Sequence, residues 1–212
     1  MKVGEEGCRF RLKRDGSVHA RFEERGNGMR TDIVEQVLSF WFAEGDSQSR
    51  AVWFKTDPSF DHEIEDRFKA HQVKALSGDY DGLADMATGA LALVILLDQF
   101  PRNLYRGSPE AFASDTKALA IARAALAAGF DQGLTPVQRT FLYLPFEHSE
   151  DRNDQEKSVQ LFEELGDEDK LKYAIEHREI IERFGRFPHR NAVLGRPSTP
   201  EEVEFLKDFD SF

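Results

Sequence analysis

Two short segments carry the side chains best suited to binding or chemistry. Residues 98–103 read Asp-Gln-Phe-Pro-Arg-Asn, and residues 184–191 read Phe-Gly-Arg-Phe-Pro-His-Arg-Asn. Both contain phenylalanine, proline, arginine and asparagine in that order, and each follows a stretch with helical periodicity. Arginine presents a planar fork of donors that matches a carboxylate or phosphate. We therefore expect two turns that face one another and receive a small anion.

Each side chain of these segments has an expected role. The arginines would hold the anion, the asparagines and a histidine would add hydrogen bonds, and two phenylalanines would form apolar walls. A competing interpretation is that the arginines only bind carbonyl groups at helix ends, where partial negative charge gathers. Asp98 also lies four residues before Arg102 and could pair with it. The predicted ligand-binding residues are Asp98, Phe100, Arg102, Asn103, His177, Phe187, His189, Arg190 and Asn191.

A third segment, residues 145–150, places His148 among carboxylates. A carboxylate beside a histidine can fix its tautomer and raise its pKa, so that the ring serves as an acid or a base. If the protein is an enzyme, His148 is the predicted general base, and Glu147 or Glu150 would orient it. The alternative is that this segment only ends one helix and begins the next, with Ser149 or Asp151 as the cap.

Charge is distributed unevenly along the chain. The sequence has 28 Lys and Arg against 39 Asp and Glu, a formal net charge of −11. Residues 145–182 contain thirteen acidic and five basic residues, whereas residues 183–197 contain four arginines and no acidic residue. The overall charge argues against nucleic acid and against an acidic membrane surface, both of which attract basic proteins. The basic island instead favours a small anionic ligand or an acidic or C-terminal peptide.

Metal and cofactor sites are not expected. The single cysteine excludes an intramolecular disulfide and an all-cysteine metal site. The histidines and carboxylates lack the short spacings of zinc motifs, and the neighbouring arginines would repel a cation. The first thirty residues lack the apolar core of a signal peptide, and the longest apolar run, residues 86–97, is too short to span a bilayer. A cytoplasmic location is therefore expected.

The chain is predicted to consist of a leader, residues 1–30, and a single helical domain, residues 31–212. In the leader, apolar residues alternate with basic ones on both sides of Asp15-Gly16, which is typical of a β-hairpin. An isolated hairpin is marginally stable, so the favoured interpretation is a poorly structured leader, with a hairpin docked on the helical domain as the alternative.

The rest of the sequence predicts an all-α fold of antiparallel helix pairs. Residues 83–99 are apolar almost all round, which predicts a buried central helix that Pro101 terminates. Thr135 and Thr199 each begin a capping box, and the helix after Thr135 is expected to end at Pro145. Two acidic amphipathic helices are predicted over residues 151–165 and 168–184.

Four motifs in order resemble a mainly bacterial family, domain of unknown function 924. They are residues 37–42, 98–103, 145–150 and 184–191, and the resemblance covers about residues 32–197. It implies a tetratricopeptide-repeat-like helical fold, although the tetratricopeptide consensus is not visible in the sequence. The resemblance supplies no activity and no catalytic residues.

Three hypotheses about function follow. The first is a helical module that binds a small anion or a peptide through Arg102 and Arg190. The second is a hydrolase of a phosphate or carboxylate substrate with His148 as its base. The third is a structural interaction domain whose arginines only cap helices. The sequence leaves the oligomeric state open.

Overall fold

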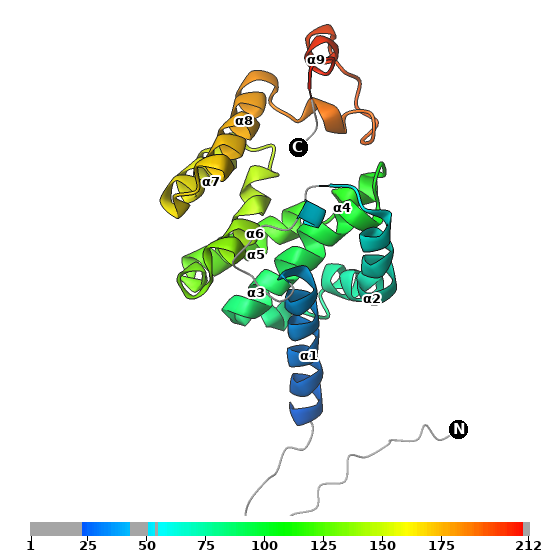
Figure 1. Cartoon of the computed structure of the whole chain (residues 1–212), viewed down its shortest axis with the longest axis vertical. Helices are drawn as coiled ribbons and strands as arrows, with labels where there is room; N and C mark the ends of the chain where they lie inside the picture. Colours follow the sequence, from blue (N-terminus) through cyan, green and yellow to red (C-terminus); the bar gives the residue numbers. More distant parts are fainter. Residues whose placement is uncertain (1–22, 43–50, 54, 210–212) are drawn as a thin grey trace, which may run out of the picture.

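The computed structural model describes residues 23–42, 51–53 and 55–209, and these form helices joined by turns (Figure 1). No strand occurs among them, which confirms the predicted all-α fold. The predicted hairpin, residues 8–22, lies outside the described residues. The helices and short helical turns are, in order, α1 (Glu23–Phe42), η1 (Ala51–Trp53), α2 (Pro58–Ser77), η2 (Asp81–Asp85), α3 (Ala87–Val94), η3 (Ile95–Gln99), α4 (Phe100–Leu104), η4 (Pro109–Ala111), α5 (Asp115–Ala127), η5 (Phe130–Gly133), α6 (Pro136–Glu147), α7 (Arg152–Leu165), α8 (Glu168–Phe184), η6 (Pro188–Arg190) and α9 (Pro200–Phe205).

Several predicted helix boundaries are found in the structure. Both capping boxes are formed, with Thr135 and Thr199 each accepting from the backbone three residues on. The acidic helices α7 and α8 agree with the predicted ranges to within a residue, and they pack side by side as an antiparallel pair (Figure 1). Helix α1 begins at Glu23, so it includes residues 23–30, which the sequence assigns to the leader.

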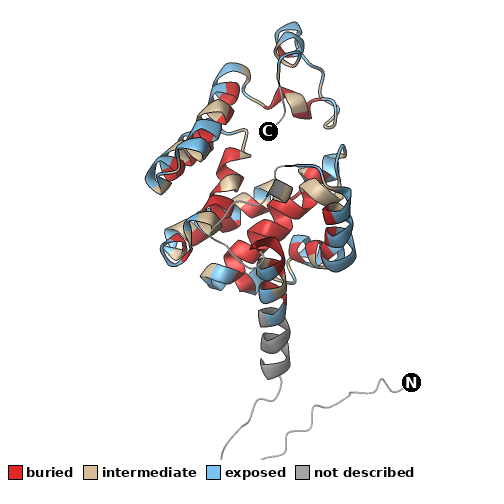
Figure 2. Cartoon of the chain, in the orientation of Figure 1, coloured by how far each residue is buried: buried red, intermediate tan, exposed pale blue. Residues whose placement is uncertain are grey.

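The central helix is buried, as predicted, but Pro101 does not end it. Residues 89–101 are all buried, and the helix continues through the π-turn η3 into α4 (Figure 2). In the π-turn the Phe100 N–H bonds the Ile95 carbonyl, five residues back. Proline at 101 has no N–H for the Leu97 carbonyl. The Ser114 hydroxyl, from the start of α5, donates to that carbonyl at 2.5 Å. The chain therefore passes the proline without leaving a buried acceptor unpaired.

Pro145 does not end its helix either. It lies inside α6, which continues to Glu147 before the chain turns at His148. Both prolines were expected to be terminators, and both expectations are wrong. As a result Glu147 and His148 sit at the very end of α6, where the chain turns toward α7.

Aromatic side chains fill the main core around the central helix. Phe100 is fully buried, with its ring centroid 5.0 Å from that of Phe68 and 5.6 Å from that of Trp41. Trp41 in turn packs edge-on against Phe141 of α6 at 5.4 Å. These rings tie α1, α2, α4 and α6 together, and aromatic pairs of this geometry add to the free energy gained by burial.

Close packing also explains one glycine of the central helix. A Cβ atom on Gly89 would lie 2.1 Å from the backbone oxygen of Leu83 in η2. Backbone cannot yield as a flexible side chain can, so this position accepts only glycine while η2 stays in contact with α3.

A second, smaller apolar cluster holds the C-terminal part together. It contains Ile180, Ile181 and Phe187, with Phe184, Phe205 and Phe209 packed against them. Helix α8 ends at Gly185, whose φ of 68° reverses the chain direction. The segment that follows returns across the end of α6, and this brings the second predicted motif close to the first.

Candidate functional site

The π-turn presents Asp98 to the end of α6, where it meets His148. His148 Nδ1 lies 2.8 Å and 3.0 Å from the two Asp98 carboxylate oxygens. Asp98 is fully buried and also accepts a hydrogen bond from Gln99 at 2.5 Å. Burial alone would raise the pKa of Asp98, but the charge of Arg102 and the hydrogen bonds from His148 and Gln99 hold it well below its ordinary value. Asp98 is therefore an anion at neutral pH.

The protonation of His148 follows from the same surroundings. Burial lowers its pKa, the Arg102 charge lowers it further, and Asp98 opposes both. The ring is thus neutral at neutral pH, and the anionic Asp98 favours the tautomer with the proton on Nδ1. The other nitrogen, Nε2, then carries a lone pair, and no other described residue hydrogen-bonds to it. This is the arrangement of an oriented general base.

The two arginine segments do meet, through the side chain of Asp115 at the start of α5. Arg102 binds Asp115 through two parallel hydrogen bonds, each 3.0 Å long. Arg190 Nη1 lies 3.6 Å from the same carboxylate. Both guanidinium groups also lie over the ring of Phe112, at 5.7 Å for Arg102 and 4.8 Å for Arg190. The first segment meets the second from within a continuous helix and not from a turn.

Arg102 has little bonding capacity left for a ligand. Besides Asp115, its Nη1 donates to the backbone oxygen of Asp98 and lies 3.3 Å from the Asp98 carboxylate. Its side chain is 21% exposed. Two carboxylates and a carbonyl already occupy this guanidinium, so its main effect is to join α4 to α5 and to hold Asp98 ionised.

Arg190 is different, because only one of its three nitrogens, Nη1, donates a hydrogen bond to another described residue. Nη1 donates to the His148 carbonyl at 3.0 Å. Nε is buried with no hydrogen-bond partner, and Nη2 makes no hydrogen bond to another described residue. The guanidinium is held between two rings, 4.4 Å from Phe187 and 4.8 Å from Phe112. Burial lowers the pKa of Arg190 to about 10, so the group remains cationic at neutral pH.

The predicted partners of His148 are corrected by these contacts. Glu147 is paired with His177 of α8 instead, with its Oε1 3.5 Å from His177 Nδ1. Glu150 accepts the Phe187 N–H at 2.8 Å and binds Arg196 at 2.7 Å and 3.0 Å. Adjacent positions on a helix point in directions about 100° apart, which takes Glu147 away from the ring of His148, and Glu150 lies past the helix end, where it is paired with Arg196.

Glu147 and His177 form a second buried pair beside the first. Burial raises the pKa of Glu147 to about 8, and the nearby Asp98 charge adds to the rise. Burial lowers the pKa of His177 to about 3, although its hydrogen bond to the Tyr173 carbonyl opposes this. Both groups are thus uncharged at pH 7. The His177 and His148 rings lie 6.5 Å apart.

Four of the predicted ligand-binding residues are occupied by other contacts. Phe100 packs in the main core and forms no wall of the site. Asn103 donates to Asp61 of α2 at 2.7 Å. Asn191 donates to Ser198 and Glu202 and accepts from Arg196. The His189 ring lies against Phe187 and Phe209, and its Nδ1 is buried without a partner.

The sequence did not identify Asp115, Phe112 or Arg196, although all three shape the cluster. Asp115 follows Ser114 at the start of an alanine-rich helix, where an acidic residue is ordinary. Arg196 belongs to the basic island, and this was the only feature of the sequence that could have pointed to it. Among the described residues, no group of three His, Cys, Asp or Glu side chains is arranged to hold a metal ion.

The family of this chain follows from a comparison with known proteins. A family model described as "Bacterial protein of unknown function (DUF924)" matches residues 37–210. The chain belongs to this family. The match includes all four motifs noted in the sequence.

A solved structure agrees with this assignment. A protein of unknown function from Agrobacterium tumefaciens is 41% identical to the chain, with a TM-score of 0.76 over 86% of this chain and 99% of that one. No curated protein matches the chain. Within the described ranges, no helix has both the length and the hydropathy needed to cross a bilayer.

Proposed function

We propose that this protein is a helical module that binds a small anionic ligand through Arg190. The observation that supports this is the buried Nε–H of Arg190, which has no partner. The Nε and Nη2 donors form the edge with which arginine holds a carboxylate or phosphate in a bidentate manner. A buried cationic donor left unpaired costs free energy, and a bound anion would recover that cost.

The surroundings of Arg190 favour a ligand with a single negative charge. The acidic groups Asp98, Asp115 and Glu150 lie around Arg102, Arg190 and Arg196, so the cluster carries little surplus positive charge. A carboxylate therefore fits better than a phosphate dianion. The rings of Phe112 and Phe187 fix the plane of the guanidinium and so fix the orientation of the bound group.

Thermal unfolding of the full chain with a panel of anions tests this proposal. Acetate, benzoate, succinate and inorganic phosphate are suitable probes at constant ionic strength. An anion at about ten times its Kd raises the free energy of unfolding by about 1.4 kcal/mol, or roughly 3–5 °C in Tm. Chloride at the same ionic strength is the reference for non-specific screening.

Two variants make the test specific. Arg190→Met keeps much of the apolar contact but removes the donors, so the anion-dependent rise in Tm is expected to disappear. Arg183→Met is the matched control, because Arg183 lies in the same basic island but is exposed and paired with Glu201. If every anion leaves Tm unchanged, or if Arg190→Met retains the rise, the binding proposal is wrong.

The Asp98–His148 pair supports a second candidate, a hydrolase of a carboxylate or phosphate ester. His148 Nε2 would accept a proton from water, Asp98 would orient the ring, and Arg190 would stabilise negative charge in the transition state. In this scheme Asp98 takes the orienting role predicted for Glu147 or Glu150.

Turnover of an ester and phosphomonoester panel separates the two candidates. His148→Gln and Asp98→Asn are each expected to lower kcat by roughly 100-fold or more if His148 is the base. His62→Gln is the matched control, since His62 is exposed on α2. Activity that survives in His148→Gln would eliminate this mechanism.

A further inference from the structure

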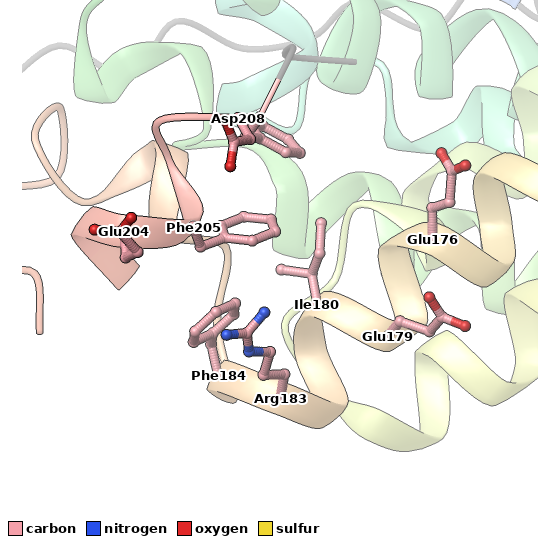
Figure 3. Close-up of a pocket in the computed structure, with 9 residues that line it drawn as sticks. Glu176, Glu179, Ile180, Arg183, Phe184, Glu204, Phe205 and Asp208 are labelled. Carbon is pink, nitrogen blue, oxygen red and sulfur yellow. The ribbon is translucent and has the colours of Figure 1, made fainter. Parts of the chain in front are cut away.

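A groove of about 550 Å³ lies between α8 and the C-terminal segment (Figure 3). Its floor is apolar. Phe184 and Phe205 have ring centroids 5.0 Å apart, and the Phe209 ring lies 5.1 Å from that of Phe205. In Figure 3 the Phe205 ring and Ile180 point toward one another from the two sides of the groove. Its volume is large enough for a few side chains of a bound segment.

The rim of this groove is acidic. Glu176 and Glu179 stand on α8, and Glu204 and Asp208 stand on the opposite side (Figure 3). Glu179 and Asp208 form no ion pair with another described residue, and both are exposed. Carboxylates on two sides of an apolar floor create a negative potential over it, which attracts a cation and repels an anion.

One arginine of the protein already shows how a cation fits here. The Arg183 guanidinium lies 4.6 Å from the Phe184 ring centroid and 5.8 Å from that of Phe205, and Nε donates to Glu201 at 2.9 Å. Stacking on an aromatic face combined with a carboxylate contact is a favourable arrangement for a guanidinium. The remaining carboxylates of the rim can provide the same arrangement for an arginine or lysine from outside.

We propose that this groove binds a basic amphipathic peptide segment of a partner protein. Its aliphatic or aromatic side chains would lie on the phenylalanine floor, and its lysines or arginines would face Glu179 and Asp208. The occupant is basic because the rim is acidic. An acidic segment carries the wrong sign for this rim.

Binding of short labelled peptides to the full chain, followed by fluorescence anisotropy, tests this proposal. The probe is Arg-Phe-Arg-Leu-Lys-Arg, which is also the sequence of residues 9–14. Two control peptides replace its apolar residues by serine or its basic residues by glutamate. The basic apolar peptide is expected to bind most tightly, the serine peptide more weakly, and the glutamate peptide not at all. Binding is expected to weaken as salt is raised.

A pair of variants locates the binding. The double variant Glu179→Gln, Asp208→Asn removes two unpaired charges and is expected to lower the affinity for the probe peptide by about three- to tenfold. The matched control Glu163→Gln, Glu164→Gln removes two exposed charges from α7 and is expected to leave the affinity unchanged. Equal affinity for the probe and the serine peptide, or an unchanged affinity in the groove variant, would overturn the proposal. Failure of the probe to bind would do so as well.

Discussion

The two ends of this fold are stabilised by different kinds of interaction. Around the central helix, rings such as Phe100, Trp41 and Phe141 pack in a core with few charged side chains. The segment after α8 has a small apolar cluster and depends on ion pairs, including Arg186 with Glu202 and Arg196 with Glu150. The candidate site lies where the two regions meet. Rigid packing on one side and polar contacts on the other position Asp98, His148 and Arg190.

The largest loss of stability is expected from a substitution in the aromatic core around the central helix. Phe100→Ala is expected to lower the free energy of unfolding by about 3–5 kcal/mol, because a fully buried ring is lost and a cavity remains. Chemical denaturation measures the change. A loss below about 1 kcal/mol would show that the core is not the main source of stability.

Buried Glu147 makes the stability of the folded protein depend on pH. Its pKa is about 8 in the folded protein, against 4.5 ordinarily. Between these values the folded state holds a proton that the unfolded state has lost, so stability from this group falls as pH rises from about 4.5 to 8.

Glu147→Gln removes this dependence, since glutamine stays neutral. The variant is expected to be more stable than the natural protein at pH 8–9, by about 4–5 kcal/mol, and close to it at pH 4–5. Urea denaturation at several pH values measures the difference. Parallel curves for the two proteins across this range would contradict the expectation.

Ser114→Ala tests how the central helix passes Pro101. The substitution leaves the Leu97 carbonyl buried without its donor, and a loss of about 1–3 kcal/mol is expected. Ser77→Ala is the matched control, because Ser77 also donates to a carbonyl but is exposed at the end of α2. Equal losses in the two variants would mean that the buried hydrogen bond of Ser114 contributes no more to stability than the exposed one of Ser77.

The smallest effect is expected in the C-terminal region. Arg196→Met removes contacts to Glu150, Asn191 and the Phe187 carbonyl, yet the side chain is 24% exposed and water screens the charge. The expected loss is about 1 kcal/mol. Amide hydrogen exchange should accelerate in residues 186–205 and not in α3. Faster exchange in α3 would show that the two regions unfold as one unit.

The sequence predicted the helices well, but it predicted only some of the contacts among the candidate site residues. Apolar spacing and capping boxes such as Thr135–Gln138 are local, so they can be recognised without the fold. The prediction that Pro101 ends a helix was wrong. The Leu97 carbonyl, which lacks an N–H donor because residue 101 is proline, accepts a hydrogen bond from the Ser114 hydroxyl, and Ser114 lies seventeen residues after Leu97 in the sequence. Likewise, nothing local distinguishes Asp115 from the other acidic residues. The meeting of Arg102 and Arg190 was predictable only because their motifs are alike.

The π-turn at residues 95–99 changes the direction in which the side chains that follow it point around the helix axis. One extra residue in a helical turn rotates everything beyond it by about 100° relative to a regular helix. Arg102, which follows this turn, has its present direction relative to α3 because of that rotation. Shortening the segment by a single residue would turn Arg102 away from Asp115 while leaving its composition almost unchanged, so chain length at this point matters as much as the identity of the side chains.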